Sequence, residues 1–409
     1  MKTGFSQVSI TPEGPCVLAG YYKPNPRFAA GVHDEVYVRA LVFPGPVVIL
    51  SLDLLCVDEL SMDRILRALA PLGVGENQLL VTAVHTHSSF GGIFDTSAGI
   101  KRELRSMFGE TDEALFAMLA ERCAGAVKEA MADMAETEIR FAKGSIDGLG
   151  TNRHSSELPH DRNLFIIELF RTDGKKILLY NLSCHPTVLN GGNLLISADF
   201  PGTIASRLRG AYDMVVFVNG SAGDVSTRFT RRESGFAECD RLGVLAAGRI
   251  TELTTTAGAT EPLERVELAY HEFCLKEAAV DEAAAAEEKL AAARRGLDVV
   301  KSSAAGAGEI RRAESFVEAA FFNLMKVKAA DGRPAGDIAL RTGILSINDK
   351  TILCVPLELF SSLALRLRSR VPVELFGYAN AVKGYLADMA AYESLDYEAL
   401  SSPFAAGEG

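Results

Sequence analysis

Long apolar runs are missing from this sequence of 409 residues, and so is any surplus of positive charge. The longer apolar stretches, such as residues 47–50 and 214–218, have the length of a strand, whereas a membrane span needs roughly 20 apolar residues. The chain holds 42 Lys and Arg against 53 Asp and Glu, and a net charge of −11 argues against binding to nucleic-acid phosphates. We therefore expect no integral membrane span and no nucleic-acid partner.

Paired cysteines and a secretory leader are also missing. The seven cysteines are an odd number without a C-x-x-C pair, which fits buried thiols in a reducing compartment better than disulfides or a cysteine-ligated zinc ion. Met1 is followed by one lysine and a mostly polar stretch, so the apolar core of a signal peptide is lacking. These features predict a cytoplasmic protein.

Apolar strand patterns alternate with helical patterns, and 48% hydrophobic residues can fill a sizeable core. This alternation predicts a single α/β domain over residues 1–409, with a mixed β-sheet core flanked by helices. The strands that we expect lie within 37–57, where a Pro-Gly-Pro turn separates two of them, directly before His85, and at 176–182, 214–218 and 350–355. The helices that we expect cover 61–72, 112–134 and 202–209.

Residues 275–330 differ in composition from the rest of the chain. They are rich in Ala, Glu, Lys and Arg, and a Gly-, Ala- and Ser-rich break at 302–308 separates two helical patterns. This predicts an inserted α-helical hairpin. It would pack on the domain surface or, alternatively, protrude as an arm for homo-oligomerisation or as a lid over the site.

Three histidines follow apolar strands. His85 and His87 form an H-x-H pair, and because residues two apart in an extended chain point the same way, both imidazoles can face one point. His185 follows a second strand directly. Three imidazoles suit Zn²⁺ better than Mg²⁺ or Ca²⁺, so the residues predict a zinc site, with a merely polar loop as the alternative.

Other polar groups also follow strands. Residues 219–226 form a Gly-containing turn that presents Ser226, although these residue types also favour an ordinary tight loop. Arg153 lies in a polar loop and could hold a carboxylate or an oxyanion, unless the loop is simply solvated. Asp53 and Asp199 lie near strand ends and are candidates for orienting the histidine rings.

Taken together, these motifs resemble the neutral/alkaline non-lysosomal ceramidase family. The motifs occur in the family's order: HTHSSFGG at 85–92, TNR at 151–153, CHPTVLN and ISADFPG within 184–202, NGSAGDVS at 219–226, PLEL at 356–359 and GYANAVKGYLADMAAYESLDYE at 377–398. The chain is similar to the short bacterial relatives that have the catalytic domain without the family's C-terminal immunoglobulin-like domain. The hairpin is not part of the resemblance.

The resemblance implies a zinc-dependent amidase. By motif, the four metal ligands fall on His85, His185, Glu358 and Tyr385. The catalytic positions fall on His87, which moves protons, and on Ser226 and Arg153, which contact the substrate carbonyl or oxyanion. Two alternatives remain at this stage: Glu358 could instead cap the helix that follows it, and Tyr385 could be a core aromatic.

The chain departs from the family's motifs beside the implied ligands. Val84 replaces a Thr, Leu357 replaces the Gly before Glu358, and Val382 replaces a Tyr. These positions would shape the substrate pocket, so we expect an N-acyl substrate other than ceramide itself. The alternatives are a metal-containing hydrolase of a polar or sugar-derived substrate, and a non-catalytic scaffold protein with a structural metal site.

Overall fold

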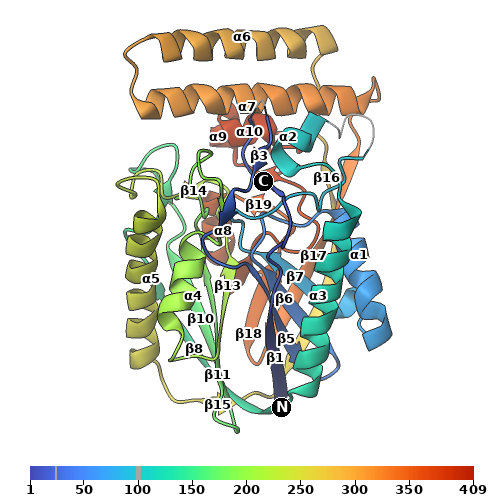
Figure 1. Cartoon of the computed structure of the whole chain (residues 1–409), viewed down its shortest axis with the longest axis vertical. Coiled ribbons are helices and arrows are strands. Elements are labelled where there is room, and N and C mark those ends of the chain that lie inside the picture. Colours follow the sequence, from blue (N-terminus) through green and yellow to red (C-terminus); the bar gives the residue numbers. More distant parts are fainter. Residues whose placement is uncertain (24, 98–102) are drawn as a thin grey trace.

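The computed structural model describes residues 1–23, 25–97 and 103–409, without the side chains of 307 and 308. Its centre is a nine-stranded mixed sheet (Figure 1). Eight of the strands follow one path, in the order β13 (Met214–Asn219), β11 (Lys176–Leu182), β10 (Asn163–Arg171), β8 (Ala135–Ser145), β1 (Lys2–Ser9), β5 (Tyr37–Phe43), β6 (Val47–Leu52) and β7 (Leu79–Ala83). The ninth, β15 (Glu261–Pro262), pairs with β8.

The main sheet has two halves in which the strands pair in the same pattern. In each half two antiparallel pairings lead to one parallel pair, which is β6 with β7 in the first half and β11 with β13 in the second. Only two residue pairs, Lys2 with Glu136 and Thr3 with Ala135, join the halves where β1 meets β8. The parallel strands are buried along almost their whole length, as expected for strands covered on both faces.

Two pairs of helices cover one face of this sheet. Helices α1 (Glu59–Leu69) and α3 (Glu113–Ala132) pack on the first half, and α4 (Phe200–Leu208) and α5 (Phe236–Thr256) pack on the second. Helix α3 begins after Asp112, whose carboxylate accepts the backbone N–H groups of Ala114 and Leu115. Two 3₁₀ turns, η1 (Ala70–Leu72) and η2 (Glu76–Gln78), connect α1 to β7.

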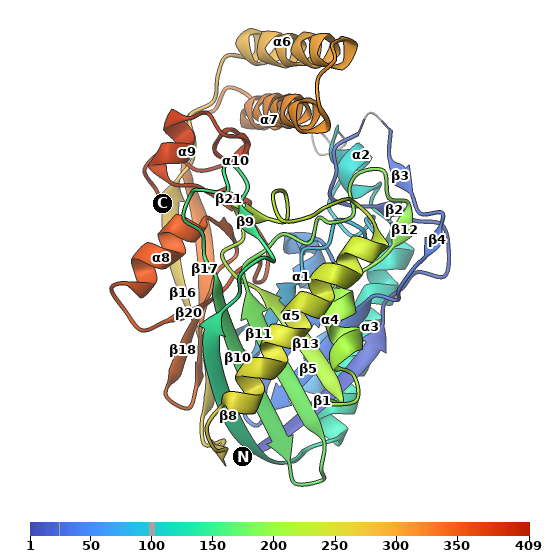
Figure 2. The same cartoon turned by 90° about the vertical axis from the view of Figure 1, so that its left-hand side faces the viewer.

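A second sheet of four strands packs against the opposite face. Its order is β16 (Val266–Lys276), β17 (Asp337–Ile347), β18 (Lys350–Cys354) and β20 (Glu374–Phe376). One apolar cluster joins the two sheets, with Phe165 and Val216 from the main sheet and Leu345 and Phe376 from the second. Figure 2 shows the smaller sheet on the left of the main sheet and α3 on the right, so the body has three layers.

Short elements gather at the end of the main sheet where β6, β7, β11 and β13 finish. The short strands there are β2 (Val17–Leu18), β3 (Arg27–Phe28), β4 (Gly31–Val32), β9 (Thr151–Asn152), β12 (Leu195–Ile196), β14 (Val225–Ser226), β19 (Glu358–Leu359) and β21 (Tyr385–Leu386). The remaining helices of the body are α2 (Arg105–Phe108), α8 (Ser361–Arg368), α9 (Met389–Glu393) and α10 (Tyr397–Ser401).

Two antiparallel helices form a hairpin across the same end of the molecule. They are α6 (Ala283–Ser302) and α7 (Ala307–Ala330), and the turn between them lies within the predicted break. Residues 275 and 276, which were predicted to begin the hairpin, are instead the last two residues of β16. Helix α7 faces the body and contacts α10, whereas α6 packs on α7 and lies outermost (Figures 1 and 2). Homo-oligomerisation through this hairpin stays a prediction.

The mixed α/β architecture predicted from the sequence is confirmed. The strand predicted at 176–182 is β11 with the same bounds, and the helix predicted at 112–134 is α3. Among the described residues, no helix is both long enough and apolar enough to cross a bilayer. The cytoplasmic location stays a prediction.

Shortening a side chain between the two sheets tests this layering. Leu345 is fully buried in the shared cluster, so Leu345→Ala should lower the free energy of unfolding by about 2–5 kcal/mol through lost burial and a residual cavity. Urea denaturation measures the difference. The matched control is Leu158→Ala, at a loop residue that is 46% exposed, which should change stability by no more than about 0.5 kcal/mol.

Candidate metal centre and active site

The loops after the parallel strands bring the three predicted histidines together. His85 lies two residues beyond β7, and its backbone is left-handed, with φ of 71°, which turns the chain sharply out of the strand. His185 lies three residues beyond β11 and bridges to Ser226 in β14. The imidazole ring centres of His85 and His87 are 4.8 Å apart, and those of His85 and His185 are 4.7 Å apart.

Backbone carbonyl groups fix the orientation of all three rings. The Nδ1 atom of His85 lies 2.8 Å from the carbonyl oxygen of Leu55, and that of His185 lies 2.6 Å from the carbonyl oxygen of Ala222. The Nδ1 atom of His87 lies 3.0 Å from the carbonyl oxygen of Gly20. A carbonyl oxygen only accepts, so each Nδ1 donates its proton and each Nε2 is left with a lone pair.

The Nε2 atoms converge with one carboxylate oxygen. Glu358 Oε2 lies 3.3 Å from the Nε2 of both His85 and His185. The Nε2 of His87 lies 3.3 Å from that of His85, and the three imidazoles have ligand atoms within 4.8 Å of one another. Ligand atoms held about 2.0–2.1 Å from a tetrahedral zinc ion are roughly 3.3 Å apart. The distances therefore match the edges of a zinc coordination tetrahedron.

Two of these converging atoms lack a hydrogen-bond partner. His185 Nε2 and Glu358 Oε2 are buried and have no hydrogen-bond partner in the part of the chain that the structure describes. Burial lowers the pKa of His185 to about 4, and burial together with the neighbouring imidazoles lowers the pKa of His87 well below its usual value. Neutral imidazoles and a carboxylate with free lone pairs are the donor set of a divalent cation. A metal ion therefore fits this cluster.

Residues from the second half and the C-terminal segment complete the wall of the site. The ladder between β19 and β21 places Tyr385 beside Glu358, and the Tyr385 ring centre is 6.5 Å from that of His185. Ser226 is buried, and its hydroxyl accepts the backbone N–H of Arg228 at 3.3 Å. The predicted site residues thus occupy one region, with Tyr385 and Ser226 at its edge.

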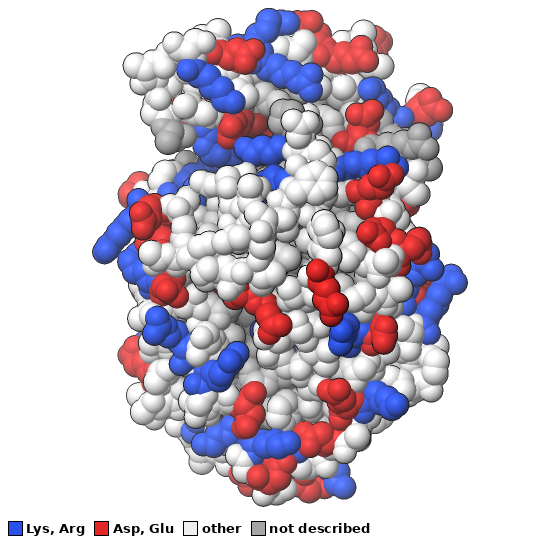
Figure 3. Space-filling model, in the orientation of Figure 1, with Lys and Arg blue, Asp and Glu red and all other residues white. Residues whose placement is uncertain are grey.

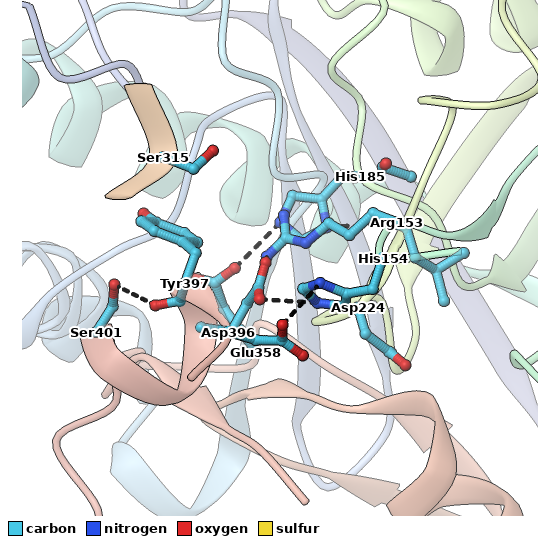
Figure 4. A network of polar contacts seen from close by, with 12 residues as sticks. Arg153, His154, His185, Asp224, Ser315, Glu358, Asp396, Tyr397 and Ser401 are labelled. Carbon is cyan, nitrogen blue, oxygen red and sulfur yellow. Dashed lines mark hydrogen bonds and ion pairs between the residues drawn. The ribbon is translucent and has the colours of Figure 1, made fainter. Parts of the chain in front are cut away.

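Arg153 also reaches the site, and it is held by an ion pair that the sequence does not reveal. Its guanidinium pairs with the buried Glu398 of α10, and His154 Nε2 lies 2.9 Å from the other carboxylate oxygen of Glu398. Figure 4 shows Arg153 and His154 in the polar network beside His185 and Glu358. Burial raises the pKa of Glu398, but the Arg153 charge and the His154 hydrogen bond outweigh it and lower this pKa to about 2. The guanidinium carbon of Arg153 lies 5.3 Å from the Tyr385 ring centre.

Two cavities of different character meet at the histidines. One, of about 480 Å³, is lined by His87, His185, Ser226 and Arg153 together with further basic side chains. The other, of about 450 Å³, is lined mainly by apolar side chains and includes His85 and Glu358. His87, Tyr385, Tyr397 and Phe322 belong to both walls. Helix α7 contributes side chains to both cavities, and its role as a lid stays a prediction.

Comparison with known proteins identifies the family. A family model described as "Neutral/alkaline non-lysosomal ceramidase, N-terminal" matches residues 2–240. The chain belongs to this family. The matched region includes His85, His87, Arg153, His185 and Ser226, whereas Glu358 and Tyr385 lie beyond it. The family consists of metal-dependent amide-bond hydrolases of ceramidase type, and the cluster of three imidazoles could hold a metal ion.

Solved ceramidase structures share the fold. A ceramidase complexed with C2 matches 99% of this chain and 72% of its own length, with a TM-score of 0.74 and 16% identity. The neutral ceramidase from Pseudomonas aeruginosa matches 99% of this chain and 71% of its own length, with the same TM-score and identity. No curated protein matches the sequence.

Two carboxylates predicted to orient the histidines have other roles. Asp53 accepts hydrogen bonds from Arg39 at 2.7 Å and from the backbone N–H of Tyr37, and Asp199 caps α4. The prediction for these two residues is wrong, because backbone carbonyls occupy the Nδ1 positions. The sequence reading also missed Tyr378, whose ring centre is 4.3 Å from that of His85 and which lies within the family motif at 377–398.

Removing the partner of Arg153 tests the ion pair. Glu398→Gln leaves a buried guanidinium without its counter-charge and should lower the free energy of unfolding at pH 7 by about 3–5 kcal/mol. The exposed Glu393→Gln in α9 is the control and should stay within about 0.5 kcal/mol of the parent. Urea denaturation at several pH values measures both variants.

The same variant has a defined pH dependence. Because folding lowers the pKa of Glu398 from 4.5 to about 2, its stabilisation is complete above pH 4.5 and is lost as the pH falls toward 2. The stability difference between the parent and Glu398→Gln should therefore shrink over that range. A difference that stays constant down to pH 2 contradicts the assignment.

Proposed function

We propose that the protein is a zinc-dependent hydrolase of N-acyl amide bonds whose substrate is not ceramide itself. The observation that carries the proposal is the convergence of the His85 and His185 Nε2 atoms on one Glu358 carboxylate oxygen, each at 3.3 Å, which is the edge length of a zinc tetrahedron. When bound, a zinc ion supplies Lewis-acid chemistry that polarises a carbonyl group and makes water nucleophilic at neutral pH.

We assign the ion to His85, His185 and Glu358, with Tyr385 as the fourth ligand. His85 and His185 are 3% and 1% exposed, and Glu358 Oε2 lies 3.3 Å from the Nε2 atom of each. Tyr385 is neighbour to Glu358 in the ladder between β19 and β21. Glu358 does not cap α8, because Phe360 occupies the N-cap position of that helix. This supports a ligand role for Glu358.

We assign proton transfer to His87. Among the three imidazoles, only His87 lines both cavities, and it is less buried than the other two. Its Nδ1 proton is held by Gly20, so Nε2 can accept a proton from the attacking water and deliver it to the departing amine nitrogen. Hydrolysis then leaves the water oxygen on the acyl carbon and one of its protons on the amine.

Ser226 and Arg153 contact the substrate carbonyl in this proposal. Both line the polar cavity beside His87 and His185. The Nε–H of Arg153 is buried and has no acceptor among the residues described, so it can donate to an oxyanion as negative charge develops there. The ion pair with Glu398 holds the guanidinium in place for this contact.

Two histidine variants separate metal binding from catalysis. His185→Ala removes a lone pair that we assign to the ion and should abolish stoichiometric zinc, as measured by metal analysis of the purified full-length protein. The exposed His271→Ala in β16 should keep its zinc and serves as the control. Zinc retained at full stoichiometry in His185→Ala would contradict the ligand assignment.

The second variant concerns proton transfer. His87→Ala should keep its zinc but lose turnover of N-acyl substrates by roughly 10²- to 10⁴-fold, the range expected for a general acid and base. Metal analysis and kcat on a panel of N-acyl amides measure both properties in one preparation. Loss of zinc in His87→Ala would instead place this imidazole on the metal, and unchanged turnover would remove it from the mechanism.

A further inference from the structure

The polar cavity is strongly basic, although the chain as a whole has a net charge of −11. Five basic side chains line it, against two carboxylates, Glu314 and Glu318. The five are Lys23, Arg153, Arg228, Arg231 and Arg311. Figure 3 shows one face of the molecule, on which Lys and Arg side chains (blue) gather where the helical hairpin meets the body. A basic cavity in an acidic protein concentrates positive potential at one place.

Carboxylates pair with part of this charge. Arg153 pairs with Glu398 behind the cavity wall. Arg311 lies 2.9 Å from Glu318 and 3.6 Å from Glu314, both on α7 itself. Among the described residues, none of these three carboxylates forms an ion pair with Lys23, Arg228 or Arg231.

Arg228 and Arg231 have no carboxylate partner in the described part of the chain. The Nη1 of Arg228 donates to the carbonyl oxygen of Arg153 at 2.9 Å, and the Nη1 of Arg231 donates to that of Thr187 at 2.6 Å. These carbonyl groups fix each guanidinium but carry no net charge to offset it. Burial and then the Arg153 charge lower the pKa of Arg228 to about 10, and the Glu398 charge opposes this shift only in part.

Both arginines lie close to the reacting groups. They follow Ser226 in one loop, and the backbone N–H of Arg228 donates to the Ser226 hydroxyl at 3.3 Å. The apolar cavity shares His87 with the polar one, and Leu55 and Met325 line only the apolar cavity. An amide bound at the histidines could therefore place an apolar portion in that cavity and a negatively charged portion beside the arginines.

We propose that the substrate is an N-acyl amine whose amine portion bears an acidic group, such as an N-acyl amino acid, and that Arg228 and Arg231 bind this group. The acyl chain occupies the apolar cavity. This inference rests on the proposed hydrolase function and names its substrate class. A carboxylate and a phosphate share the chemistry that two guanidinium groups recognise, so the experiment includes both.

Binding to the purified full-length protein tests the charge preference without turnover. We use uncleavable ketones in which CH₂ replaces the amide N–H: 4-oxoundecanoic acid, with a carboxylate, and 1-hydroxyundecan-4-one, its neutral counterpart of equal chain length. A third compound carries a phosphate in place of the hydroxyl. Calorimetry should show roughly 10- to 100-fold tighter binding of an acidic compound than of the neutral one, as expected for charge-assisted hydrogen bonds. Equal or weaker binding overturns the proposal.

Variants locate the preference. Arg231→Gln should weaken binding of the acidic compounds roughly 10-fold or more and leave binding of the neutral compound unchanged, which removes most of the preference. Arg231→Lys should keep part of the preference. Arg232→Gln, in the same loop but exposed, is the matched control and should change neither affinity. A preference that survives in both Arg231→Gln and Arg228→Gln overturns the assignment to these residues.

Kinetics with cleavable compounds distinguishes this inference from the hydrolase function. N-octanoylglycine should have a KM roughly 10- to 100-fold below that of N-octanoylethanolamine, with a similar kcat. Equal KM values for the two amides would keep the hydrolase and overturn the acidic-group site. Absence of turnover for both, with the binding preference intact, would overturn the hydrolase and leave the acidic-group site supported.

Discussion

The whole centre depends on three hydrogen bonds from imidazole rings to backbone carbonyl oxygens. Leu55, Ala222 and Gly20 hold the Nδ1 protons of His85, His185 and His87, so every Nε2 presents a lone pair to one point. A carboxylate in these positions would add negative charge behind the rings, whereas a carbonyl fixes the tautomer without it. The site is therefore as well ordered as the loops that carry these carbonyls, and those loops end the strands of a buried sheet.

The two halves of the main sheet contribute in parallel ways. In the first half, His85 follows β7 and bonds to a carbonyl that follows the adjacent parallel strand, β6. In the second half, His185 follows β11 and bonds to a carbonyl that follows the adjacent parallel strand, β13. Glu358 then comes from the segment between β18 and β20 of the second sheet. Because both sheets supply a group, the centre can form only when the body is fully folded.

The sequence predicted the elements with continuous apolar patterns and the histidines that follow them. Strand β11 is buried along almost its whole length, and α3 buries residues at helical spacing along one face, which is why their bounds were close to correct. Of the second sheet, the sequence predicted only the strand at 350–355, which is β18; β16 and β17 pair across the inserted hairpin, and such a long-range pairing leaves no local pattern. The Nδ1 partners are backbone atoms that any residue could supply, and Glu398 meets Arg153 only through tertiary contact across 245 positions, so neither leaves a local pattern.

Helix α7 forms one wall of both cavities but supplies none of the groups assigned to the ion. Its side chains Arg311, Phe322 and Met325 line these cavities, although the helix packs mainly on its own partner helix, α6. Mutations in this helix can therefore alter which compounds fit while the chemistry beneath is preserved. The hairpin gives the scaffold a replaceable part through which homologous enzymes can diverge in specificity without losing their shared reaction.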